Sequence, residues 1–153
     1  MAPDPAPVST HPNVTLAQFG PPARWQDLRH LHPRLGEVAG KQFIGRILGL
    51  DGMEVSLNAL APGGAVPFLH AHRENEELYL FLDGEGEFQV DGRILPVAAG
   101  TALRVAPAGM RGWRNTGTVP LTFLCIQAKA GSLDHATGGD GILGEQPPAW
   151  PAR

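Results

Sequence analysis

Residues 64–84 read GAVPFLHAHRENEELYLFLDG, and the fold prediction begins from this stretch. His70 and His72 are two residues apart, so a strand places both imidazoles on the same face. Glu77 follows His72 at an odd offset, and the polar residues 73–75 are therefore expected to turn or bulge. If the chain then folds back onto the histidines, the three side chains converge. Two neutral imidazoles and one carboxylate form a facial triad, which holds first-row metal ions with open positions for water or substrate.

A strand is predicted after this turn because side chains alternate in character from residue 77 onward. One face carries Glu77, Tyr79 and Phe81, and the other carries Leu78, Leu80 and Leu82. Short apolar runs separated by Gly, Asp and Pro continue through residues 40–129, with Asp-Gly turn signals among them. This spacing predicts an all-β sandwich or barrel. The predicted strands are Lys41–Leu48, Glu54–Leu60, Ala65–His70, Leu78–Leu82, Glu87–Val90, Arg93–Val97, Ala102–Val105, Arg111–Asn115 and Leu121–Ala128.

The stretch 64–84 resembles the first motif of the cupin superfamily. That motif is Gly, five residues, His-X-His, three or four residues, Glu, six residues and Gly. The matching positions are Gly64, His70, His72, Glu77 and Gly84. The resemblance covers about residues 40–130 and implies a single cupin-type β-barrel, also described as a double-stranded β-helix or jelly roll. It also implies a homodimer, because small cupins commonly pair through their outer strands.

The second cupin motif is Gly, five residues, Pro-X-Gly, two residues, His, three residues and Asn, and this chain departs from it. Gly100 and Asn115 have the family's separation, but the Pro and the inner Gly are displaced by one position, to Pro107 and Gly109. Arg111 stands at the position of the His. The fourth metal ligand of a typical cupin is therefore missing, because a guanidinium has no free lone pair to offer a metal ion.

Arg111 leads to two alternatives. If His70, His72 and Glu77 hold a divalent metal ion, an inward Arg111 adds a second cation to a barrel of low dielectric. We then expect a carboxylate, enolate or similar small anion to bridge the metal ion and the guanidinium. Without a metal ion, Arg111 can instead form a buried ion pair with Glu77, which would close the site.

The cupin resemblance leaves two classes of function open, because the fold hosts isomerases, dioxygenases, decarboxylases, storage proteins and sugar-binding regulators. The first is a metal-dependent enzyme, such as a dioxygenase or an isomerase, with Fe, Mn, Ni or Zn at the triad and an anionic substrate on Arg111. The second is a non-catalytic barrel that binds a small molecule without a functional metal, closed by the Arg111–Glu77 pair. No catalytic residue is assigned in either case.

Three further polar residues are candidates for substrate binding beside Arg111. Ser56 and Asn58 share one face of a predicted strand, and Tyr79 lies on the same face as Glu77. Tyr79 is also expected to fill the barrel interior. Cys125, the only cysteine of the chain, lies in an apolar alternation and is expected to be a buried structural thiol.

The chain of 153 residues is predicted to contain one domain with a terminal segment on each side. Residues 1–24 are rich in proline and predict an extended N-terminal arm. Residues 25–130 form the predicted barrel domain, which begins with a short helix over Trp25–Leu31. Residues 131–153 are expected to form a C-terminal tail, in which Trp150 is an unusual aromatic residue.

Charge and patterning exclude several classes of protein. The net charge of −3 and the pI near 6.0 argue against a basic nucleic-acid or membrane-surface binder. The N-terminal residues lack the pattern of a signal peptide, and no apolar run is long enough for a membrane-spanning helix. We therefore expect a cytoplasmic protein with neither a nucleic-acid nor a membrane partner.

Overall fold

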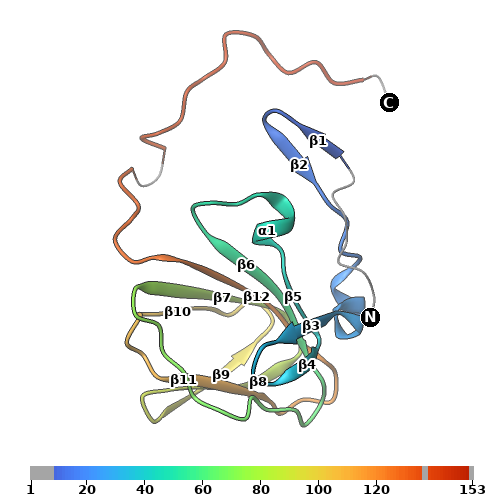
Figure 1. The fold of residues 1–153 in the computed structure, drawn as a ribbon, viewed down its shortest axis with the longest axis vertical. Helices are drawn as coiled ribbons and strands as arrows, with labels where there is room; N and C mark the ends of the chain where they lie inside the picture. Colours follow the sequence, from blue (N-terminus) through green and yellow to red (C-terminus); the bar gives the residue numbers. More distant parts are fainter. Residues whose placement is uncertain (1–8, 136–137, 152–153) are drawn as a thin grey trace.

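Two antiparallel sheets form the barrel in the computed structural model, which describes residues 9–135 and 138–151 (Figure 1). The larger sheet has the strand order β10-β7-β12-β6-β5, and the smaller sheet has the order β11-β8-β9. The prediction of an all-β barrel is thus confirmed. The strands of the larger sheet are β5 (Lys41–Phe43), β6 (Glu54–Leu60), β7 (Asn75–Asp83), β10 (Ala102–Val105) and β12 (Leu121–Lys129), and those of the smaller sheet are β8 (Glu85–Val90), β9 (Arg93–Ala98) and β11 (Arg111–Asn115).

Aromatic side chains fill the space between the two sheets. Tyr79 and Phe81 of β7 are buried, whereas Leu82 at the end of the alternating pattern is exposed, so the predicted alternation of β7 is confirmed. Tyr79 packs edge-on against Phe88, with ring centroids 4.8 Å apart. Trp113 of β11 stacks on Phe88 at 5.7 Å, and its ring centroid also lies 5.4 Å from that of Tyr79. Such aromatic pairs add to the free energy of area burial and make this interior rigid.

The predicted strand Lys41–Leu48 is wrong in its second half. β5 ends at Phe43 and is followed by one helical turn, α1 (Gly45–Leu48). The carboxylate of Glu54 accepts a hydrogen bond from the N–H of Gly45 at 2.8 Å, and Gly49 ends the turn in the left-handed conformation. Since Glu54 lies nine residues ahead, the local apolar run gave no sign of this turn.

The predicted strand Ala65–His70 is also wrong, because residues 61–74 form a loop between β6 and β7. Only isolated bridges join this loop to β11, one of them between His70 and Arg111. Pro67 has no N–H to donate and interrupts a continuous ladder. The loop still runs beside β11, and this holds His70 in register with Arg111.

The predicted helix over Trp25–Leu31 is replaced by a 3-10 helix, η1 (Pro22–Asp27), and a strand, β3 (Arg29–His32). Pro22 favours the first helical position because its φ is already set. The residues after Asp27 pair instead with β4 (Gly36–Ala39). Trp25 is buried against the outer face of β6, where it packs with Leu57 and Ala59.

The described parts of the N-terminal arm and of the C-terminal tail lie outside the barrel (Figure 1). The described part of the N-terminal arm contains a hairpin, β1 (Ser9–His11) and β2 (Val14–Leu16), that the sequence analysis did not predict. In the described part of the C-terminal tail, Ile142, Leu143 and Trp150 are exposed. Among the described residues, no helix is long and apolar enough to cross a membrane.

The last glycine of the first motif is a position at which this fold demands glycine. Gly84 has φ +78, and a Cβ there would lie 2.5 Å from the backbone oxygen of Pro120. Gly92 has a similar φ of +80 but has open space around the Cβ position. Both positions favour glycine through their backbone, and only Gly84 adds a backbone clash.

We predict that Gly84→Ala destabilises the barrel more than Gly92→Ala does. The Gly92→Ala change carries only the backbone penalty of a left-handed residue, about 1–2 kcal/mol. Gly84→Ala adds the displacement of the strand entry at Pro120. Urea unfolding followed by tryptophan fluorescence measures both changes, and equal losses of stability would contradict this account of the motif.

Candidate metal centre

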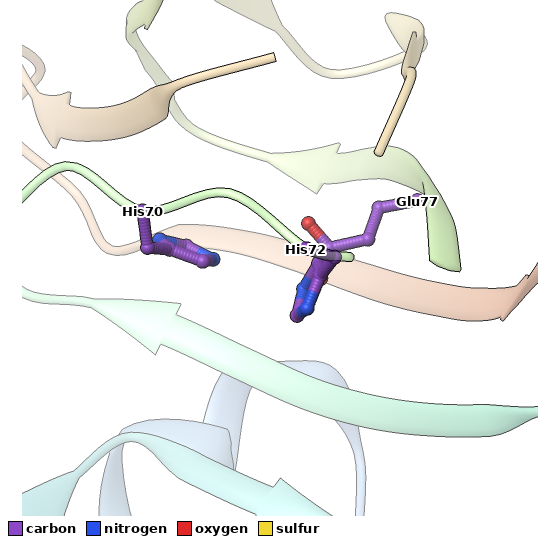
Figure 2. A group of neighbouring side chains, drawn as sticks. All are labelled: His70, His72 and Glu77. Carbon is purple, nitrogen blue, oxygen red and sulfur yellow. The ribbon is translucent and has the colours of Figure 1, made fainter. Parts of the chain in front are cut away.

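The three predicted ligands come from the loop between β6 and β7 and from the start of β7 (Figure 2). The loop is fastened at both histidines by backbone hydrogen bonds. His70 and Arg111 exchange two such bonds, of 3.0 and 2.9 Å, and the N–H of His72 donates to the oxygen of Pro107 at 2.9 Å. Glu77 lies on β7 between β10 and β12, opposite Val105 and Gln127. The backbone positions of the three residues are therefore set by ordered neighbours.

The structure brings the three side chains together. One potential ligand atom from each of His70, His72 and Glu77 lies within 4.8 Å of the other two. His72 Nε2 is 2.9 Å from Glu77 Oε1, and the ring centroids of His70 and His72 are 5.5 Å apart. The chain bends at residues 73–74, immediately before β7 begins at Asn75, and this bend allows the convergence expected from the spacing of His72 and Glu77.

The two carboxylate oxygens of Glu77 have different partners. Oε2 accepts hydrogen bonds from Arg111 Nε and Nη2, at 2.9 and 2.5 Å, and from the hydroxyl of Tyr79 at 2.5 Å. Oε1 instead faces His72, and it accepts a long contact of 3.5 Å from the Cys125 thiol. The ion pair with Arg111 thus occupies one oxygen and leaves the other directed at the histidines.

Arg111 is completely buried, and its hydrogen bonds are made within the chain. Besides the two bonds to Glu77, Nη1 donates to the backbone oxygen of Gly109 at 2.9 Å, with longer contacts to Pro107 and His70. Arg111 therefore points into the barrel, as both alternatives from the sequence require. Its partner, however, is Glu77, and its complete burial leaves the guanidinium inaccessible to a small anion from solvent.

These contacts decide the charge of Glu77. Burial alone would raise the pKa of this carboxyl, but hydrogen bonds from Tyr79 and Arg111, together with the positive charge of Arg111, outweigh it and lower the pKa to about 2. The pKa of Arg111 is raised, because its bonds to Glu77 outweigh the cost of burial. Glu77 is therefore ionised at neutral pH and available as an oxygen ligand.

His70 is held in its neutral form. Burial, followed by the charge of Arg111, lowers its pKa to about 4. Its Nδ1 atom is buried without a hydrogen-bond partner in the described part of the chain. A neutral imidazole with unused bonding capacity suits a metal ion, since only the uncharged ring offers a lone pair.

The donor set therefore fits a divalent first-row metal ion. Two imidazole nitrogens and one carboxylate oxygen are borderline ligands that Fe, Mn, Ni and Zn all accept. Metal binding at His72 Nε2 and Glu77 Oε1 would replace the hydrogen bond between these two atoms. Arg111 and Tyr79 would remain on Oε2 and would orient the carboxylate from behind, as supporting groups do in many metal sites.

Ser56 and Asn58, the other candidate substrate-binding residues, lie in the interior but bind a lysine. The side-chain amide of Asn58 donates to Ser56, and its Oδ1 accepts a hydrogen bond from Lys41 Nζ at 2.9 Å. Lys41 also contacts Ser56 Oγ at 3.5 Å and lies over the Phe43 ring, 4.6 Å from its centroid. Lys41 is a functional candidate that was not predicted from the sequence, although its place on the strand before Asn58 offered a weak signal.

Two cavities lie near the centre without containing the triad in their walls. The larger, of about 600 Å³, lies against the outward-facing residues of β8 and β11, beside residues 65–69 of the loop. The smaller, of about 80 Å³, is lined by Lys41, Asn58, Phe123 and Trp113 among others. Trp113 lines both cavities and packs edge-on against His70, with ring centroids 6.0 Å apart.

Cys125 takes no part as a nucleophile in this arrangement. The thiol is buried, as predicted, and burial followed by the charge of Glu77 raises its pKa to about 12. Since the thiolate is the reactive form, the thiol is inert at neutral pH. Cys125 therefore serves as a packing residue beside the carboxylate.

A double-stranded β-barrel that carries His-X-His and Glu on its interior defines the class of protein. The cupin domain family matches residues 56–127 of the chain. The crystal structure of a cupin protein from Bacteroides fragilis is 43% identical and has a TM-score of 0.66, over 68% of this chain and 88% of that one. The chain belongs to the cupin superfamily.

Two curated proteins match shorter stretches. An uncharacterized protein of Methanocaldococcus jannaschii is 35% identical over 75 residues, which is 48% of this chain and 60% of that protein. The oxalate-binding protein of Thermotoga maritima is 36% identical over 67 residues, which is 44% of this chain and 54% of that protein. The chain thus matches little more than half the length of each of these relatives.

We predict that Arg111→Met destabilises the metal-free barrel by about 3–5 kcal/mol, because it leaves the buried charge of Glu77 without its cation. Arg114→Met, on the same strand, is the matched control. Arg114 pairs with Glu87 at the surface and its side chain is 61% exposed, so the loss there is about 0–1 kcal/mol. Urea unfolding measures both, and similar losses for the two variants would contradict the buried ion pair.

A second prediction concerns pH. The folded state lowers the pKa of His70 from 6.5 to about 4. Between these two pH values, His70 is therefore protonated in the unfolded chain and neutral in the folded protein. The contribution of His70 to stability is complete above about pH 6.5 and is lost as the pH falls towards 4. In metal-free protein, His70→Gln should therefore reduce the fall in unfolding free energy across this window, whereas His135→Gln in the exposed tail should not. Parallel pH profiles for wild type and His70→Gln would refute it.

Proposed function

We propose that this protein binds one divalent first-row metal ion through His70, His72 and Glu77, and a small organic anion beside it. The observation that carries the proposal is the division of the Glu77 carboxylate. Oε2 is held by Arg111 and Tyr79, and Oε1 lies 2.9 Å from His72 Nε2, while one ligand atom from each of the three residues lies within 4.8 Å of the others. Three ligands from the protein leave positions for water or a substrate.

The charge balance of the site supports the binding of a small anion. Arg111 and Glu77 cancel each other, so a divalent ion and Lys41 together would leave about +3 at the centre, which repels itself in a low-dielectric interior. A bound carboxylate or similar oxyanion offsets most of this charge. The oxalate-binding relative from Thermotoga maritima, whose name specifies a small dicarboxylate, is consistent with such a ligand.

The metal ion would supply a Lewis acid that polarises the bound anion or holds a second reactant. The residues of the chain have separate tasks around it. Arg111 and Tyr79 fix the direction of the Glu77 carboxylate, and burial keeps His70 neutral. Dioxygenase or isomerase chemistry would require this arrangement, and so would reversible binding of the anion alone.

A second candidate is a barrel that binds its small molecule without metal. The hydrogen bond of 2.9 Å between His72 and Glu77 favours it, because this bond and the Arg111 pair together already satisfy both oxygens of the carboxylate. In that case the pair would close the site, as the second alternative from the sequence requires. The two candidates differ in one measurable quantity, the metal content.

Elemental analysis of untagged protein purified without chelators tests the metal centre. We expect near-stoichiometric Fe, Mn, Ni or Zn in the wild type and its loss from His70→Ala, with the fold retained by circular dichroism. His135→Ala, in the exposed tail, serves as the control and should keep the metal. Absence of metal from wild-type protein after incubation with each of the four ions would establish the metal-free candidate instead.

A further inference from the structure

Lys41 is a cation inside the barrel without a full counter-charge. Its Nζ is held by two neutral oxygens, from Asn58 and Ser56, and lies over the ring of Phe43. Among the described residues, no carboxylate forms an ion pair with it. Burial is the main cause that lowers its pKa, and the charges of Glu77 and Glu54 offset this only in part. A bound anion would relieve this cost.

The hydrogen bonds around Lys41 hold it in one place. Asn58 directs its amide nitrogen at the backbone oxygen and hydroxyl of Ser56, which leaves Oδ1 as the only side that can face Lys41. β5 and β6 place Lys41 directly opposite Asn58. An ammonium group has three donors, and one remains after the bonds to Asn58 and Ser56. Ser56 and Asn58, which were expected to bind substrate, therefore position the ammonium group of Lys41.

The cavity beside Lys41 limits what can bind there. It measures about 80 Å³ and is closed by Phe123 and Trp113 on its apolar side. A water molecule occupies about 30 Å³ in the liquid, so this space holds two or three waters or one compact carboxylate. Trp113 also packs against His70, and Lys41 contributes to the low pKa of that histidine. The cavity and the candidate metal centre are therefore neighbours.

We propose that Lys41 is the anion-binding residue of this site, and that its ligand is a compact carboxylate placed between Lys41 and the candidate metal centre. The inference rests on the proposed function, because it assigns the anion to the same site. It transfers the role first expected of Arg111 to Lys41. The charge of Arg111 is neutralised by its ion pair with Glu77, whereas Lys41 has no ion-pair partner among the described residues and has one N–H donor left for a ligand.

The chain has only two lysines, Lys41 and Lys129, and this makes the test direct. Protein labelled with 15N at the lysine side chains gives one Nζ signal per lysine, assigned with the variant Lys129→Met. Oxalate is the probe, and oxamide, its uncharged diamide of similar shape, is the control ligand. We expect oxalate to shift the Lys41 signal and to leave that of the exposed Lys129 unchanged, and oxamide to shift neither.

Calorimetric titration of oxalate into metal-loaded protein gives the second measurement. Lys41→Met should weaken oxalate binding about tenfold or more, Lys41→Arg should restore part of it, and Lys129→Met should have no effect. The metal content of all three variants should equal that of the wild type, because none of these residues is a predicted ligand.

The outcomes separate the two proposals. Oxalate binding that survives Lys41→Met, or wild-type protein that fails to bind oxalate, overturns the role of Lys41 whatever the metal content. Wild-type protein without metal overturns the metal centre, while a Lys41 signal shifted by oxalate in the same metal-free sample still supports the lysine. A lower metal content in Lys41→Met would show that the residue acts on the metal ligands and would refute an anion-binding role.

Discussion

A single buried carboxylate, that of Glu77, organises the polar interior of this barrel. A charge placed inside a low-dielectric interior destabilises the fold unless hydrogen bonds and an opposite charge compensate it. Here Arg111 and Tyr79 supply three donors to one oxygen, and Arg111 supplies the charge. The backbone bonds between His70 and Arg111 then tie the histidine loop to the same residue. The residue that neutralises Glu77 therefore also helps to position His70.

This constraint gives a physical meaning to the arginine at the family's histidine position. A histidine at this position would be the third imidazole and the fourth metal ligand, and it would leave the rear oxygen of the carboxylate to other donors. Arg111 instead binds that oxygen and offers nothing to a metal. The centre thus has an internal cation in place of a fourth ligand. Because Arg111 already neutralises the carboxylate of Glu77, the charge of a bound metal ion would need a separate anion to balance it. Lys41, on the opposite wall, adds to the same excess.

The sequence predicted the parts of this structure that depend on local periodicity. The alternation of β7 and the spacing from His70 to Gly84 located the triad, because both are properties of neighbouring residues. Some of the errors have longer-range causes, such as the Glu54 carboxylate that shapes the turn at Gly45, nine residues away. Lys41 was missed for the same reason, since its partner Asn58 is brought opposite it only by the pairing of β5 with β6.

Whether the ion pair closes the site or prepares it depends on the second oxygen of Glu77. In a bidentate ion pair, Arg111 would bind both oxygens of the Glu77 carboxylate. Neither oxygen would then be available to a metal ion, and the ion pair would have only a structural role. Both of its bonds fall on Oε2, however, and His72 meets Oε1. A metal ion would then need to displace only the one hydrogen bond between His72 and Glu77, while the buried ion pair with Arg111 stays intact. An ion pair of this geometry keeps the carboxylate ionised and oriented, which is what a three-ligand metal centre requires of its only anionic ligand.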